Sequence, residues 1–174
     1  MTAFYILTRY LTFPGAFVRC LWEQMVCRIH GIPMEDTRLL RRDELCSHIE
    51  HELFPKAGGA FAIGFVPALF NAVLALLLAI GPVLGTFVFH MSNPIVTAVD
   101  IVAYWFAFSL YVNSYPSIED ALNMKETVYR KGNLFQKIMF TPGFIGCYIG
   151  AYLERWGITF LCALAGLILL LVRF

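Results

Sequence analysis

The chain has 174 residues, of which 59% are hydrophobic and 14% are charged, and its mean hydropathy is +0.70. A soluble domain carries roughly a quarter charged residues, so this chain has more apolar surface than it can bury and needs lipid to cover the rest. Its formal net charge is only +1, which argues against a nucleic-acid partner. The composition therefore predicts one all-α integral membrane domain over residues 1–174 and argues against a soluble enzyme.

The cysteines and the N-terminal stretch argue against a disulfide-rich or zinc-binding protein and against a cleaved signal peptide. The five cysteines show no Cys-x-x-Cys spacing, and we expect neither a disulfide framework nor a zinc knuckle. The first apolar stretch lacks a basic n-region and an Ala-x-Ala-like cleavage site. We expect it to be a retained helix rather than a removed signal peptide.

The first of about four predicted transmembrane helices covers residues 4–29. Pro14 can occupy the first turn of a helix there, where its missing N–H costs nothing. This stretch also contains four charged side chains, which in a membrane helix face protein or water. They are Arg9, Arg19, Glu23 and Arg28.

The second and third spans come from a long run without charge. No Asp, Glu, Lys or Arg occurs between Lys56 and Asp100, and this length accommodates two spans at about 20 residues each. We expect them at residues 60–80 and 95–115, with Gly81-Pro82 ending or kinking the first. The one acid of the third span, Asp100, is expected near a membrane interface.

The fourth predicted span lies in residues 143–173. Glu154 and Arg155 interrupt this apolar stretch, so a short or re-entrant piece over residues 143–155 before a single crossing is also open.

Two polar loops, residues 31–56 and 116–139, remain between the spans. With four crossings they fall on the same side of the membrane. Both contain several Lys and Arg residues, whereas the opposite connection near His90 contains none. By the positive-inside rule the two loops should face the cytosol or the matrix.

Three short motifs occur in a fixed order along the chain. They are Phe13-Pro14-Gly15, then G-x-x-P-x-x-x-N over residues 64–71, then Y-P-S-x-x-D-A over residues 115–121. In this order they resemble the small integral-membrane zinc metallopeptidases related to the site-2 proteases. In that family F-P-G opens the H-E-x-x-H helix and the last element reads F-P-S-x-x-D-A. The resemblance covers most of residues 11–125.

The resemblance implies a degenerate member of that family. Aligned without gaps, the two zinc-binding histidines fall on Arg19 and Glu23, and the catalytic glutamate falls on Cys20. A guanidinium has no lone pair for a metal, and a thiol does not replace a carboxylate base in this chemistry. Asp120 falls where the family places a third, acidic ligand. The resemblance thus implies a pseudoenzyme without catalytic residues, cofactor or metal, whose remnant polar cluster is Arg19, Cys20, Glu23 and Asp120.

Two interpretations of Arg19 remain open. It can form a plain i, i+4 ion pair with Glu23 on one helix face. It can also stand in for the lost zinc and neutralise Asp120, so that a guanidinium holds two helices together.

His48 and His51 are weak alternative metal candidates. Histidines at i and i+3 can share a helix face, with Glu52 nearby. A charged loop beside a membrane also contains such residues for solvation alone, and the resemblance implies a β-hairpin-like segment here.

We therefore expect a non-catalytic structural or accessory subunit of a larger membrane complex. Its expected partners are other membrane subunits and lipid, and a respiratory or ATP-synthase assembly of the mitochondrial inner membrane is one host. Two alternatives stay open: a zinc metallopeptidase using His48, His51 and Asp120, or a carrier or channel component whose path is lined by Arg19, Glu23 and Asp120.

Overall fold

The computed structural model describes residues 7–8, 10–35, 49–87 and 93–172. Within these ranges the fold is all-helical, as the composition predicts, and the only bridge is an antiparallel pair between Met34 and His51. The helices are α2 (Phe13–His30), α3 (Ala57–Phe87), α4 (Pro94–Val112), α5 (Ile118–Lys131), α6 (Leu134–Arg155) and α7 (Ile158–Val172).

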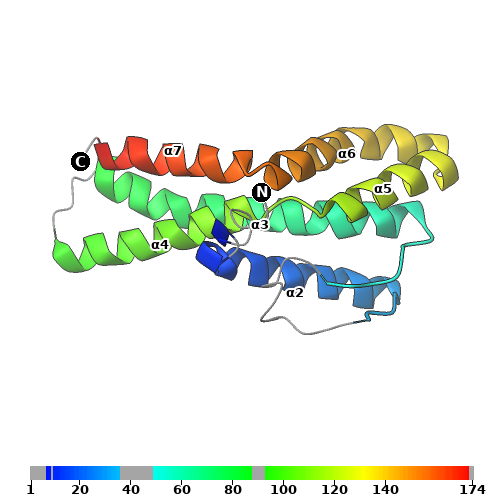
Figure 1. Ribbon diagram of the computed structural model, residues 1–174, viewed down its shortest axis with the longest axis horizontal. Helices are drawn as coiled ribbons and strands as arrows, with labels where there is room; N and C mark the ends of the chain where they lie inside the picture. The colour runs from blue at the N-terminus through cyan, green and yellow to red at the C-terminus, as the bar shows by residue number, and fades with distance from the viewer. Residues whose placement is uncertain (1–6, 9, 36–48, 88–92, 173–174) are drawn as a thin grey trace.

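Helix α3 is the central element, and α2, α4, α5 and α6 all pack against it. Its 31 residues make it about 46 Å long at about 1.5 Å per residue. Figure 1 shows α2, α5 and α6 along one half of α3 and α4 and α7 along the other half. The molecule is therefore an elongated bundle whose two ends differ in the helices that surround α3.

Helix α3 does not stop at Gly81-Pro82, where the sequence suggested an end or a kink of the span at residues 60–80. It continues through Pro67 and Pro82 to Phe87. Each internal proline removes one backbone hydrogen bond, and apolar helices in a bundle tolerate that loss because neighbouring groups satisfy the freed carbonyls.

Helix α4 begins where the predicted third span begins but ends earlier. Asn93 caps it, because its side chain accepts a hydrogen bond from the Ile95 N–H at 3.0 Å. The helix ends at Val112 rather than at residue 115.

The polar segment at residues 116–139 is not a loop, and this prediction is wrong. It contains α5 and the first turns of α6. Ser117 caps α5 by accepting from the Asp120 N–H at 3.0 Å, and acids in the first turn and bases in the last turn suit the helix dipole. The apolar face of α5 buries Met124 and Val128 against α6. Hydropathy identified the segment as polar, but its amphipathic pattern decides that it is helical.

The last predicted span, residues 143–173, is divided between two helices. Helix α6 starts at Leu134, well before the predicted boundary, and ends at Arg155. Gly157 then adopts a positive φ of 72°, and α7 leaves at a bend of 80°. The polar pair Glu154-Arg155 that interrupted the apolar pattern thus marks the end of a helix.

Two of the described helices are long and apolar enough to cross a membrane. The stretches that qualify are Ala57–Gly85 and Ile95–Val112, and the bent pair of α6 and α7 is a third if it counts as one span. Helix α2, the core of the predicted first span, is not among these stretches.

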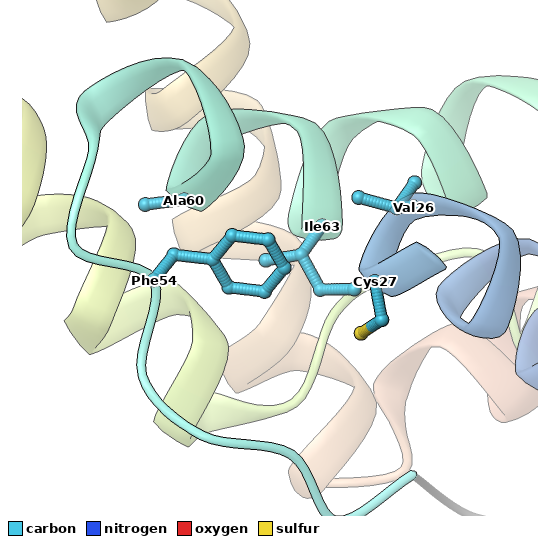
Figure 2. Packing of buried hydrophobic residues seen from close by; sticks show 5 residues of the cluster. All are labelled: Val26, Cys27, Phe54, Ala60 and Ile63. Atoms are coloured by element: carbon cyan, nitrogen blue, oxygen red, sulfur yellow. The ribbon is translucent and has the colours of Figure 1, made fainter. Parts of the chain in front are cut away.

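One hydrophobic cluster joins α2 to the start of α3 (Figure 2). Val26 and Cys27 of α2 pack against Ala60 and Ile63 of α3, and Phe54 covers them from the segment before α3. The Phe54 carbonyl accepts a hydrogen bond from Thr127 of α5 at 3.5 Å. The described end of the first polar segment, residues 49–56, therefore lies against α5 of the second.

Candidate functional site

The Phe-Pro-Gly motif sets the position of α2 against its neighbours. The Gly15 N–H donates to the Ser109 hydroxyl of α4 at 2.7 Å, and a Cβ on Gly15 would lie 2.0 Å from the Ser109 carbonyl oxygen. Asn71 of α3 donates to the carbonyls of Asn113 at 3.1 Å and of Gly15 at 3.4 Å. Asn71 thus hydrogen-bonds across helices, and only glycine fits at position 15 of α2.

One turn further along α2, Arg19 is buried with a side-chain exposure of 1%. Its Nε donates to Glu23 Oε1 at 2.8 Å, so the predicted i, i+4 ion pair is present. Its Nη1 donates to Glu154 Oε1 of α6 at 3.4 Å. One guanidinium therefore holds carboxylates from two different helices.

Glu23 extends this contact to a third element. Its Oε2 accepts a hydrogen bond from the backbone N–H of Ile49 at 3.1 Å. Cys20, at the position of the family's catalytic glutamate, is buried and packs against Ala16 and Ile49. This thiol side chain fills space between α2 and the segment that precedes α3.

Asp120 forms a second ion pair close to the first. Its Oδ1 lies 3.2 Å from His51 Nε2, and its Oδ2 accepts from the Ser117 hydroxyl at 2.8 Å. The imidazole ring stands edge-on to Phe54 with 5.3 Å between the ring centroids. An antiparallel bridge between Met34 and His51 connects the residues that follow α2 to those that precede α3.

The surroundings of His51 favour its protonated form. Nδ1 lies 2.9 Å from the Glu52 carbonyl oxygen, which only accepts, while Nε2 faces a carboxylate oxygen. Burial alone would lower the pKa of His51, but the hydrogen bond and charge of Asp120 outweigh it and raise the pKa to about 8. An imidazolium satisfies both neighbours with an N–H donor.

The structure brings together most of the predicted cluster but changes its pairing. Arg19 contacts Glu23 and Glu154 rather than Asp120. Asp120 instead pairs with His51, whose segment also contacts α2 through the Ile49 N–H and Glu23. The direct pairing of Arg19 with Asp120 that the zinc-replacement hypothesis required is not among the contacts of Arg19.

Glu154 belongs to this cluster, although the sequence did not predict its place there. The signal was present, because an acid inside an apolar stretch of a membrane protein needs a partner. From the sequence, Glu154 was interpreted only as an interruption of the fourth predicted span. Its contact with Arg19 depends on the docking of α6 against the bundle, which no local pattern encodes.

The residues that could hold a metal do not form a ligand set in the part of the chain described here. No group of three or more His, Cys, Asp or Glu residues there is arranged around a common ion position. Of the weak metal candidates, His51 lies against Asp120, and His48 lies outside the described residues. Metal binding at His51 Nε2 would also require this nitrogen to carry no proton.

The arrangement as a whole is an electrostatic clamp, by which we mean Arg19, Glu23, His51, Asp120 and Glu154. It connects α2, the segment before α3, α5 and α6. Buried charges of this kind stabilise one arrangement of helices because each would be costly without its partner.

The chain matches no model of a known protein family, no curated protein and no solved structure. The resemblance to site-2-protease-like peptidases therefore depends on the order of the motifs alone.

Proposed function

We propose that this chain is a non-catalytic, protease-like integral membrane protein that serves as a structural or accessory subunit of a larger membrane complex. The observation that carries the proposal is the buried Arg19 guanidinium, shared between Glu23 and Glu154 where the motif resemblance puts a zinc site. A permanent cation that donates hydrogen bonds can replace the charge of a metal, but it cannot activate water.

Four crossings follow if α2 counts as a span. The charges that lower its hydropathy include Arg19 and Glu23, and both side chains have an exposure of 1%. Charges that are paired inside a bundle do not face lipid, so they do not prevent insertion. Helices α3 and α4 supply two further crossings, and the bent pair of α6 and α7 supplies the fourth.

Both polar segments then face one compartment. The contacts of Thr127 with Phe54 and of His51 with Asp120 support this, because each joins one polar segment to the other. Their Lys and Arg residues favour the cytosol or the matrix. A respiratory or ATP-synthase assembly of the mitochondrial inner membrane is the host that we propose.

Native electrophoresis in a mild detergent tests the subunit role. The full chain, extracted from its own membranes, should migrate in a large complex, and mass spectrometry should identify the same membrane subunits in repeated preparations. Migration of the chain alone, at the size of its 19.7 kDa polypeptide plus detergent, would refute it.

A membrane zinc peptidase is the second candidate, and one distance favours it. His51 Nε2 and Asp120 Oδ1 are 3.2 Å apart, a separation that two ligands of one zinc ion can have. Metal analysis of purified protein decides between them. Zinc near one equivalent that is lost in His51→Gln but kept in Glu126→Gln, an exposed carboxylate on α5, would favour the peptidase.

A carrier or channel component finds less support. Such a role needs Arg19, Glu23 and Asp120 to line a water-filled path. In the structure these side chains are nearly fully buried, and they contact protein groups from neighbouring elements.

A further inference from the structure

Asp100 is the one acid within the apolar stretch Ile95–Val112 of α4. It lies about 9 Å along the helix axis from Pro94, at about 1.5 Å per residue. Its carboxylate rests against α3 at Gly85, where an added Cβ would stand 3.1 Å from Oδ2. The glycine leaves room for the carboxylate between the two helices.

No hydrogen bond or ion pair satisfies Asp100 within the described residues. Its neighbours on α4 are apolar and open, with exposed fractions of 61% for Val99, 63% for Ile101 and 52% for Val102. Helix α3 contributes no charged side chain anywhere along its length. This acid differs from those of the electrostatic clamp, which all contact a cationic or N–H donor.

A cation would stabilise an acid in this apolar environment. An Asp within the apolar stretch of a membrane helix is unfavourable by itself, and such residues pair with an opposite charge or meet water. A second copy of this chain would bring a second Asp100 to the site, and like charges at that distance repel. A basic side chain from another polypeptide fits the open apolar surface and the charge.

We propose that the open face of α4 around Asp100 is a docking surface for a membrane helix of a partner subunit, and that this helix carries a Lys or Arg at the depth of Asp100. The inference rests on the proposed function as a subunit and names the chemistry of its partner. Val99 and Ile101 flank the ion pair and pack against the partner helix, where they exclude water and strengthen the attraction.

Photo-crosslinking in native membranes tests the docking surface. A photoreactive amino acid replaces Val99 in the full-length chain, and the crosslinked peptide is identified by mass spectrometry. The expected product is a transmembrane segment with a Lys or Arg within about one helical turn of the crosslinked residue.

Charge variants then test the ion pair. Asp100→Asn should lower the crosslink yield about tenfold, while Asp100→Glu keeps most of it because the charge remains. Asp100→Lys should abolish the crosslink, and the exchange of the partner's basic residue for Asp should restore it. Asp100→Asn should unfold at the wild-type temperature or above it, since it removes only an unpaired charge from the isolated chain.

Several results would overturn the docking surface. The first is a crosslink to lipid only, to a second copy or to a helix without Lys or Arg. The second is an unchanged crosslink yield in Asp100→Asn. The third is an equal loss of crosslink yield in Arg173→Gln, which would place the cation in this chain. The native electrophoresis separates the two proposals. A large complex that forms without Asp100 refutes this inference alone, whereas a chain that migrates alone refutes both.

Discussion

Arg19 is the largest of the fully buried side chains among the described residues. Its position on α2 made an ion pair with Glu23 predictable, because residues four apart share a helix face. Arg19 also contacts Glu154, so that this ion pair connects α2 to α6. Since both carboxylates and the guanidinium are shielded from water, loss of the cation leaves two acids near each other without compensation.

Removal of Arg19 alone should therefore lower the free energy of unfolding more than removal of the charges of both Arg19 and Glu154. We expect Arg19→Leu to destabilise the protein by about 3–5 kcal/mol, the usual result of breaking a buried charge cluster. Adding Glu154→Gln should recover part of that loss, with a coupling energy of about 0.5–3 kcal/mol. Thermal unfolding in detergent measures both effects.

Arg130 of α5 provides the matched control. It forms an i, i+4 pair with Glu126 at 2.7 Å, but the two side chains are 77% and 62% exposed. Arg130→Leu should cost no more than about 0.5 kcal/mol. Additive losses in the Arg19 and Glu154 double variant, or equal losses at Arg19 and Arg130, would contradict the role of the clamp.

His51 should make stability depend on pH. Its folded pKa of about 8 lies above the unfolded value of about 6.5, so the imidazolium stabilises the fold fully below pH 6.5. This contribution is lost as the pH rises through 8. We expect a decrease on the order of 1 kcal/mol between pH 6.5 and 9, measured by unfolding temperatures across that range.

Asp120→Asn tests the cause of that dependence. Without the carboxylate the pKa of His51 should fall, because only the Glu52 carbonyl and the charge of Glu23 then oppose the effect of burial, and the decrease in stability above pH 6.5 should become smaller. The same pH profile in the wild type and in Asp120→Asn would show that another group is responsible.

The helices meet through small and polar residues at the middle of α3. Gly15 lets the backbone of α2 approach α4, and Asn71 and Asn113 hydrogen-bond across the contact. Close approach at glycine is a common way for membrane helices to pack, since lipid gives them little hydrophobic reason to associate. This contact places the first turn of α2 and thereby the position of Arg19.

Gly15→Ala should separate α2 from α4. The new Cβ would stand 2.0 Å from the Ser109 carbonyl oxygen, and backbone cannot move aside as a flexible side chain can. We expect a loss of about 1–3 kcal/mol in the free energy of unfolding.

Gly146→Ala on α6 is the control for this change. An added Cβ there meets no atom within 4 Å, so alanine should leave stability unchanged or raise it by up to about 1 kcal/mol. A similar effect at both glycines would show that helix propensity, rather than the contact with α4, determines the outcome.

The two halves of the described bundle differ in polarity, since α5 is polar whereas α4 and α7 are apolar. The polar segments meet through Thr127 and Phe54 at the end where α2 and α5 flank α3, while α4 and α7 surround the other half (Figure 1). Many of the exposed side chains of α3 and α4 are large and apolar, as a lipid-facing surface requires.

Protease sites inserted into the two polar segments should be cut from the same face of oriented vesicles. Suitable positions are residues 40–44 and the turn at Gly132-Asn133. A site at residues 89–91, between α3 and α4, should be cut only from the opposite face. Cleavage of the two polar segments from opposite faces would contradict four crossings.

Much of this fold could be predicted from the sequence because its strongest signals are local. The charge-free run after Lys56 predicted α3 and α4, and Pro14 predicted the first turn of α2. Caps and periodicity that identify α5 were equally local, but a polar composition concealed them. The failures at Pro82 and at residues 116–139 come from treating proline and polarity as sufficient evidence for a break.

The sequence by itself determined the all-helical class, the apolar stretches and the pairing of Arg19 with Glu23, because these follow from composition and from spacing within one helix. Only the tertiary structure decided that Glu154 shares Arg19, that His51 pairs with Asp120, and that Asp100 has no hydrogen bond or ion pair among the described residues. The reason is physical: contacts between residues 19 and 154 or 51 and 120 depend on how whole helices pack. That packing is set by many side chains and by close backbone approaches such as the one at Gly15.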